Sequence, residues 1–266
     1  MIRVAVTGAC GRMGTLIVRN VLSADDMELV AGFDLVRLGE DIGNIVGGGA
    51  LGINITHPDN LAPELVKTKT DVLIDFTIAH AAVKTIETAC NSNVNLVVGT
   101  TGFTPEQQQQ NEENIKKSKI KVVIAPNFSI GVNVFLKLIK EATKHLYNYD
   151  IEIIEAHHNQ KKDAPSGTAI KAAEIINQEL TEAKPIIYGR QGLSPRESEI
   201  AIHAIRGGNI VGDHTVLFVG DGEQIEIKHR AHSRQTFAAG AIIAARWISK
   251  EEISPGVYGM KDILNL

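Results

Sequence analysis

The first 125 or so residues alternate short apolar runs with stretches whose apolar positions repeat at helical spacing. The apolar runs are residues 2–7, 28–33, 72–75, 95–98 and 121–125, and helical spacing is found at residues 13–22, 79–90 and 105–118. Strands that alternate with amphipathic helices form a parallel sheet with crossover connections, so this part predicts a doubly wound α/β domain. Nearly all-apolar runs such as 121–125 fit strands that are covered on both faces.

The pattern changes after residue 129. A helical pattern at 132–147 precedes a strand at 151–156, a second helical pattern lies at 169–176, and β-like runs follow near 200–206, 214–220 and 224–230. The later runs alternate apolar and polar residues, which is typical of a sheet with one buried face and one open face. This part therefore predicts a second, α+β domain with an open mixed sheet.

The last helical pattern, residues 236–247, consists of small and apolar residues nearly all round. Such a helix must be buried, and we expect it to return to the first domain. We therefore predict a discontinuous first domain, formed by residues 1–128 and 236–266, and a second domain formed by residues 129–235.

The composition excludes several classes of function. A net charge of −4 and a pI near 6.1 give no basic field, so we expect no nucleic-acid partner. No apolar stretch reaches the length of a spanning helix, and the chain starts directly with a strand pattern, so we expect no membrane role and a cytoplasmic protein. Cys10 and Cys90 lack the spacing of metal ligands, which predicts two free thiols and no metal site.

A glycine-rich turn, Gly8-Ala-Cys-Gly-Arg-Met-Gly14, lies between the first strand and the first helix. Glycine allows the tight turn and the close approach of a pyrophosphate, whose charge the helix N-terminus attracts. The motif departs from the commoner G-x-G-x-x-G, and a plain strand-to-helix turn is the alternative. Its position favours a Rossmann-like nucleotide site.

The second strand ends at Asp34, twenty residues after Gly14, where an acid can bind the ribose hydroxyls. This carboxylate would repel a 2′-phosphate, and Leu35 offers no guanidinium to attract one. We therefore expect NADH to be favoured. Arg12 and Arg37 could soften this preference, so NADPH remains possible.

A second turn, Gly99-Thr-Thr-Gly102, follows a strand at the carboxyl edge of the predicted sheet. Ligands bind at this edge in open α/β sheets, so the turn could line the nicotinamide ribose. A polar turn without a ligand is the alternative.

The segment from Glu155 to Thr168, Glu-Ala-His-His-Asn-Gln-Lys-Lys-Asp-Ala-Pro-Ser-Gly-Thr, connects a predicted strand to a predicted helix. Exposed N–H groups at a helix start bind carboxylate or phosphate, and Gly167 would let the ligand approach the backbone. The histidines and lysines would add charge and a proton. A solvated histidine pair followed by an ordinary helix cap is the alternative.

Together, residues 6–14, 99–102, 125–129 and 155–168 resemble the 4-hydroxy-tetrahydrodipicolinate (dihydrodipicolinate) reductase family. The resemblance covers essentially the whole chain, and the His-His-x-x-Lys-x-Asp-Ala-Pro-Ser-Gly-Thr block is highly specific. It implies reduction of a cyclic dicarboxylate by NADH or NADPH in lysine and diaminopimelate biosynthesis, with the 4-hydroxyl lost as water. It also implies that residues 1–128 and 236–266 form the dinucleotide-binding domain and that residues 129–235 form a domain for substrate binding and oligomerisation. The family is commonly tetrameric, so a homo-oligomer is expected.

The resemblance also implies roles for individual residues. His157 would be the proton donor and acceptor, and Lys161 a second proton donor. Substrate would be held by His158, Gly167 and Thr168. The cofactor would contact Gly8, Ala9, Cys10, Gly11, Arg12, Met13, Asp34, Gly99, Thr100, Thr101, Ala125, Pro126, Asn127 and Phe128.

One departure from the family pattern concerns the cofactor, because many members carry Arg after the ribose-binding acid and this chain has Leu35. Two other functions stay open. A sugar or polyol dehydrogenase would share the nucleotide half, although the compact His-His-x-x-Lys block fits a dicarboxylate better. A non-catalytic NADH-sensing module would bind the cofactor but no small acid. For Arg206 we favour a structural role within the second sheet.

Overall fold

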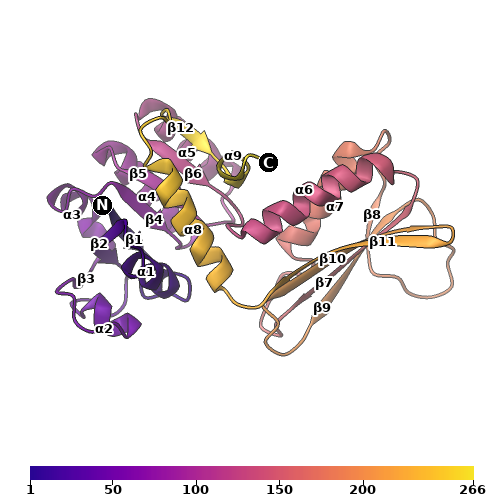
Figure 1. Cartoon of the computed structure of the whole chain (residues 1–266), viewed down its shortest axis with the longest axis horizontal. Coiled ribbons are helices and arrows are strands. Elements are labelled where there is room, and N and C mark those ends of the chain that lie inside the picture. The colour runs from indigo at the N-terminus through magenta and orange to yellow at the C-terminus, as the bar shows by residue number, and fades with distance from the viewer. The chain divides into compact units, whose positions relative to one another are not determined.

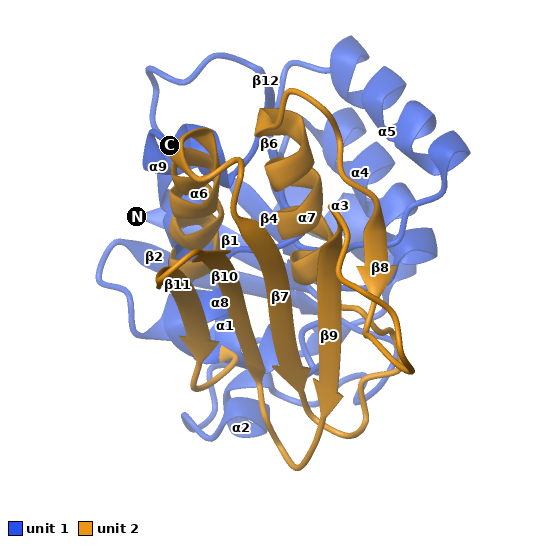
Figure 2. Cartoon of the chain, turned by 90° about the vertical axis from the view of Figure 1, so that its right-hand side faces the viewer, with its two compact units in different colours: residues 1–130, 235–266 blue, residues 131–234 orange.

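The computed structural model describes residues 1–266 and divides the chain into two compact units. Unit 1 contains residues 1–130 and 235–266, and unit 2 contains residues 131–234 (Figures 1 and 2). None of the helices combines the length and the apolar composition that a membrane span requires.

Unit 1 is built on a seven-stranded, wholly parallel sheet in the order β12-β6-β5-β4-β1-β2-β3. Its strands are β1 (Ile2–Thr7), β2 (Met27–Phe33), β3 (Ile55–Thr56), β4 (Val72–Asp75), β5 (Asn95–Val98), β6 (Lys121–Ile124) and β12 (Gly256–Tyr258). The predicted doubly wound, Rossmann-like sheet is confirmed.

Helices cover both faces of this sheet, as the apolar strands require. They are α1 (Gly14–Leu22), α2 (Ile42–Val46), α3 (Leu61–Lys67), α4 (Ala79–Ser92), α5 (Pro105–Lys117), α8 (Gln235–Ile248) and α9 (Met260–Leu264), with a 3₁₀ turn at Pro58–Asn60. One apolar cluster joins the sheet to α1, α2, α8 and α9, and a second joins it to α3, α4 and α5.

Helix α8 returns the chain to unit 1, and its small residues let it pack closely. Ala238, Ala241 and Ala245 are fully buried in the same cluster as residues of α1. A Cβ at Gly240 would lie 1.8 Å from the carbonyl oxygen of Phe128. The helix therefore lies against the segment that follows β6, where only glycine fits.

Unit 2 contains a five-stranded mixed sheet in the order β11-β10-β7-β9-β8. Its strands are β7 (Asp150–His157), β8 (Ile186–Tyr188), β9 (Ile200–Arg206), β10 (Gly212–Gly220) and β11 (Glu223–Ala231). Neighbours β7 and β10 are antiparallel, as are β10 and β11, whereas β9 runs parallel to both β7 and β8. Helices α6 (Ile130–His145) and α7 (Gly167–Glu179) cover one face (Figure 2). The predicted open mixed sheet is confirmed.

Several short elements were not predicted: α2, β3, α3, β8, β12 and α9. Strands of two or three residues contain too few positions to show an alternation, and a five-residue helix has little more than one turn. Pairing with neighbouring strands defines these short strands.

Candidate active site

The glycine turn joins β1 to α1 as a compact backbone loop. Gly8 has a φ of +70°, in the left-handed region that glycine adopts readily. A Cβ at Gly14 would lie 2.0 Å from the Gly8 carbonyl oxygen and 2.8 Å from Cα of Ala9. The turn therefore requires glycine at both positions and brings the start of α1 against the end of β1.

Asp34 follows β2 and contacts this turn. Its Oδ2 accepts the N–H of Cys10 at 2.9 Å, and its Oδ1 accepts the N–H of Leu35 at 2.7 Å. Burial, and then the Asp34 charge, raise the pKa of the Cys10 thiol to about 11, so this thiol stays neutral. Arg37, which could have softened the cofactor preference, pairs with Glu40 at 2.8 Å.

Six of the predicted cofactor residues line one cavity of about 260 Å³. They are Met13, Gly99, Thr101, Pro126, Asn127 and Phe128, joined by Phe76 and by Phe237 of α8. The rings of Phe76 and Phe128 lie 5.5 Å apart. The turns after β4, β5 and β6 therefore meet at the carboxyl edge of the sheet, as a parallel sheet requires.

Thr100 differs from its neighbours because its side chain is buried and bound to Asp75. Its Oγ1 donates to Asp75 Oδ1 at 2.7 Å and accepts the N–H of Thr77 at 3.0 Å. Asp75 also accepts the hydroxyl of Thr7 at 2.8 Å. The side chain of Thr100 thus ties strand ends together, and only its backbone is left for a ligand. Ala9 and Ala125 are likewise buried.

A second cavity, of about 420 Å³, lies at the ends of β1, β2 and β4. Gly8, Asp34 and Leu35 line it, and so do three basic side chains, His57, His80 and Lys84. Asp59 and several threonines also line it, and most of its exposed lining surface is apolar. A cavity beside Asp34 suits the adenosine part of a dinucleotide.

In unit 2, the predicted motif connects the last residue of β7, His157, to the first residue of α7, Gly167. Ser166 caps the helix, because its Oγ accepts the N–H of Ala169 at 3.3 Å. A Cβ added at Gly167 would meet no atom within 4 Å, so space lies in front of this helix start. The predicted anion site therefore has the open approach that it needs.

Glu155, on β7, is the first residue of the motif, and its side chain is fully buried. Its Oε2 lies 2.6 Å from Nδ1 of His157, and Arg206 donates to both carboxylate oxygens at 2.8 Å. Its Oε1 accepts the N–H of Ser166 at 2.9 Å. Burial raises the pKa of Glu155, but the hydrogen bonds from His157, Arg206 and Ser166 outweigh it and lower this pKa to about 2.

Lys161 lies in the connecting loop and is held by a neighbour. Its Nζ donates to both carboxylate oxygens of Asp163, at 2.8 and 2.7 Å. This hydrogen bond lowers the pKa of Asp163, which favours the carboxylate form of that residue. The backbone N–H of Lys161 donates to the carbonyl of His158 at 3.1 Å. The loop thus presents its ammonium group in a fixed position.

His214, on β10, is buried behind the motif. Its Nε2 lies 3.0 Å from Oγ of Ser166, and its ring meets that of His157 edge-on, with centroids 5.2 Å apart. Burial, and then the nearby His157, lower the pKa of His214 to about 4. His214 is therefore uncharged at neutral pH, and it hydrogen-bonds the Ser166 hydroxyl that caps α7.

This burial predicts a pH-dependent stability. The pKa of His214 in the folded protein lies below its ordinary value of 6.5. The neutral His214 side chain therefore contributes fully to the unfolding free energy above pH 6.5, and this contribution is lost as the pH falls towards about 4. Between about pH 7 and about pH 5, the wild-type protein should lose about 2 kcal/mol more unfolding free energy than His214→Gln. Urea denaturation at both pH values measures this difference. Equal losses in the two proteins would contradict the prediction; Glu155 titrates at lower pH and contributes little here.

Two residues that organise the motif, Glu155 and His214, were given no role from the sequence. The signal was present, because the alternation of β7 places Glu155 on the same face as Ile151 and Ile153. A carboxylate at a core-facing position of a strand must be paired. Arg206 was predicted to have a structural role, and the structure places its guanidinium on Glu155 and on the Asp163 carbonyl, within the motif.

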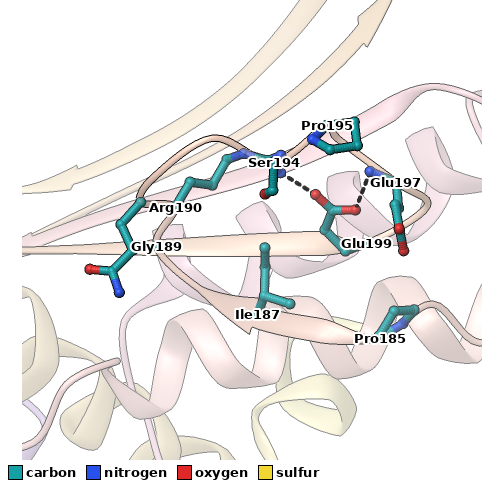
Figure 3. Close-up of a pocket in the computed structure, with 9 residues that line it drawn as sticks. Pro185, Ile187, Gly189, Arg190, Ser194, Pro195, Glu197 and Glu199 are labelled. Atoms are coloured by element: carbon teal, nitrogen blue, oxygen red, sulfur yellow. Dashed lines mark hydrogen bonds and ion pairs between the residues drawn. The ribbon is translucent and has the colours of Figure 1, made fainter.

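A further cavity of unit 2, of about 310 Å³, lies in the connection between β8 and β9 (Figure 3). Arg190 points to Glu199, whose carboxylate also accepts the N–H of Glu197 at 2.8 Å. The charges of Arg190 and Glu199 are therefore already paired, and none of the predicted site residues lines this cavity.

Comparisons with known proteins match the chain over nearly its whole length. Residues 2–128 match the family model "Dihydrodipicolinate reductase, N-terminus", and residues 131–264 match "Dihydrodipicolinate reductase, C-terminus". A 4-hydroxy-tetrahydrodipicolinate reductase of Methanosarcina acetivorans is 56% identical over 266 residues and covers all of both chains. One from Methanocaldococcus jannaschii is 49% identical and covers 100% of this chain and 98% of its own.

Solved structures agree with the sequence matches. A dipicolinate-bound dihydrodipicolinate reductase from Paenisporosarcina sp. TG-14 superimposes with a TM-score of 0.77, at 31% identity, over 97% of each chain. A myo-inositol dehydrogenase from Corynebacterium glutamicum reaches a TM-score of 0.58 at 15% identity over 96% of this chain and 90% of its own, which shows a shared fold alone. The chain therefore belongs to the dihydrodipicolinate reductase family.

Proposed function

We propose that this protein is a 4-hydroxy-tetrahydrodipicolinate reductase of lysine and diaminopimelate biosynthesis. The substrate (2S,4S)-4-hydroxy-2,3,4,5-tetrahydrodipicolinate would lose its 4-hydroxyl as water and gain a hydride and a proton, giving (S)-2,3,4,5-tetrahydrodipicolinate. A bound NADH or NADPH would supply the hydride. The observation that carries this proposal is the motif of unit 2, which unites an open helix start with His157 and Lys161.

Each group of the motif has a task in this reaction. The N–H groups of Gly167 and Thr168, at the start of α7, would hold a substrate carboxylate, with His158 as a further contact. His157 would donate and accept a proton, and Lys161 would be the second proton donor. Holding the ring by its carboxylate orients it for reduction, which can lower the barrier by several kcal/mol.

The residues of unit 1 fit a nicotinamide dinucleotide. The backbone of Gly8 to Met13 at the start of α1 suits a pyrophosphate, and the cavity beside Asp34 suits adenosine. The cavity lined by Met13, Gly99, Thr101 and Pro126–Phe128 suits the nicotinamide end. The assignment of a dinucleotide to unit 1 is thus supported by the conformation of the Gly8–Gly14 turn and by two cavities at the carboxyl edge of one sheet.

We expect NADH to be the better cofactor. Asp34 would accept the ribose hydroxyls, Leu35 brings no guanidinium, and Arg37 is paired with Glu40. NADPH is the alternative, because His57, His80 and Lys84 line the same cavity. Initial rates, with substrate made by the preceding synthase from pyruvate and aspartate semialdehyde, should give about tenfold or higher kcat/KM for NADH.

The same assay tests the reaction itself. Oxidation of NADH should require the substrate, and a folded protein that gives no turnover with either cofactor would refute the proposed function. A kcat/KM that favours NADPH would refute only the cofactor preference. Asp34→Ser combined with Leu35→Arg should shift the ratio towards NADPH, because it removes a negative charge and adds a phosphate ligand.

Two other functions are distinguished by ligand binding. A sugar or polyol dehydrogenase shares the fold, as the inositol dehydrogenase shows, and a sensing module would bind NADH alone. Thermal unfolding with NADH, and with NADH plus pyridine-2,6-dicarboxylate, separates these cases, because only the reductase gains further stability from the diacid.

We also propose that the protein is a homo-oligomer, a tetramer by its family, and that it acts in the cytoplasm. The uncovered face of the five-stranded sheet carries Ile154, Leu217 and the half-exposed Ile205. These apolar side chains lie on a face that no helix of unit 2 covers, and exposed apolar groups of this kind favour pairing between subunits. Light scattering after size-exclusion chromatography measures the subunit number.

A further inference from the structure

Glu155 is a buried charge that the proposed reaction does not use directly. It is 0% exposed on the helix-covered face of β7, between strands β10 and β9. Removing a carboxylate from water costs several kcal/mol unless hydrogen bonds and opposite charges compensate for it. The groups that bind the Glu155 carboxylate therefore indicate the role of this buried charge.

The partners come from three separate elements. His157 ends β7, Arg206 ends the neighbouring strand β9, and Ser166 caps α7. One carboxylate thus fixes the imidazole of His157 and, through the Ser166 N–H, the helix start proposed to hold the substrate carboxylate. These two groups must keep a constant separation if one substrate is to contact both.

A second connection reaches the loop between them. Nη2 of Arg206, already bound to Glu155, also donates to the carbonyl of Asp163 at 2.6 Å. The carboxylate of Asp163 in turn holds Nζ of Lys161. Glu155 is therefore linked by hydrogen bonds to each group assigned to proton transfer and to the anion-binding helix start.

The contact also determines which nitrogen of His157 can exchange protons. A carboxylate only accepts hydrogen bonds, so Nδ1 of His157 must carry the hydrogen. Nε2 is then the nitrogen left for exchange. It lies beside Gly212, where an added Cβ would be 3.1 Å away, so a side chain at position 212 would crowd Nε2.

We propose that Glu155 is the positioning residue of this site: it holds His157 as the Nδ1–H tautomer and sets its distance from the start of α7. The effect on turnover rests on the proposed reductase function, whereas the tautomer does not. A buried ion pair that serves stability alone is the competing explanation, and it makes no demand on the tautomer of His157.

Glu155→Gln tests the proposal with little change of shape. The amide keeps one oxygen for the Ser166 N–H or for Arg206, but its NH₂ end cannot accept a hydrogen bond from Nδ1–H of His157. We expect His157 to change to the Nε2–H tautomer, seen in two-bond ¹H–¹⁵N spectra and assigned by its absence in His157→Asn. The kcat should fall by about 10²-fold or more, with little change in the Kd of NADH.

The same strand offers a matched control. Glu152 lies on the opposite face of β7, 2.7 Å from Nε2 of His203 and 3.3 Å from Nε of Arg196, so it has the same two kinds of partner. Glu152→Gln should lose a comparable ion pair yet keep the kcat and the tautomer of His157.

Several outcomes would overturn the proposal. They are an unaltered tautomer in Glu155→Gln, a kcat no lower than that of Glu152→Gln, or an Nε2–H tautomer in the unsubstituted protein. The last measurement does not use Glu155→Gln, so it decides even if that variant does not fold. If the unsubstituted protein shows the Nδ1–H tautomer but reduces no substrate, the proposed reaction fails and the arrangement stands.

Discussion

Replacing Lys161 by alanine is expected to lower kcat by about 10²- to 10⁴-fold, the usual contribution of a positioned proton donor. The Kd of NADH should hardly change, because the residues that fit the cofactor belong to unit 1 and Lys161 belongs to unit 2. Pre-steady-state rates with saturating NADH, together with fluorescence titration of NADH, separate the two effects.

Lys162→Ala is the matched control for this substitution. It removes the same charge from the adjacent, exposed position, and an exposed charge is largely screened by salt. Its kcat should stay within about threefold of the wild-type value. If Lys161→Ala weakens NADH binding as much as it lowers kcat, or if both variants behave alike, Lys161 is a structural residue and not a proton donor.

Gly14→Ala is expected to disable the cofactor site. The added Cβ would lie 2.0 Å from the Gly8 carbonyl oxygen and 2.8 Å from Ala9 Cα, and neither backbone atom can move without opening the turn. The unfolding free energy should fall by about 1–3 kcal/mol, as in other overpacked sites. The affinity for NADH should fall by about 10²-fold or more, since the pyrophosphate loses its helix start.

Denaturant unfolding and calorimetric titration with NADH measure these two losses. Gly48→Ala is the control, because a Cβ at Gly48 would meet nothing closer than 3.9 Å. That variant should bind NADH normally and be as stable as the wild type, or slightly more stable. Normal NADH affinity in Gly14→Ala would show that the turn does not hold the dinucleotide.

The sequence predicted the elements that have a clear periodicity. Strands β1, β4 and β6 are short, mostly apolar runs, and the alternation of β10 and β11 correctly indicated a sheet with one open face. The strand-to-helix position of the glycine turn and of the residue 155–168 motif also followed from these patterns. Each of these two features lies between a strand pattern and the helical pattern that follows it, so its position can be read from the sequence alone.

Interactions between distant residues could not be predicted in this way. Thr100 was expected to contact the cofactor, yet its hydroxyl is bound to Asp75, 25 residues away in the chain. The contact between Arg206 and Glu155 spans 51 residues and depends on the parallel pairing of β7 with β9, in which Arg206 lies opposite His157. Strand order and register determine such contacts, and neither is visible in a single sequence.

The late return of α8 to unit 1 has a consequence for how the protein is made. Unit 2 is one continuous segment that is complete at residue 234, whereas unit 1 needs α8, β12 and α9 from the end of the chain. When the first 130 residues have been synthesised, the face of the sheet that α8 covers is still without that helix. Because domains tend to fold as they leave the ribosome, unit 2 can fold first. The nucleotide-binding half then closes later, once α8, β12 and α9 have been synthesised.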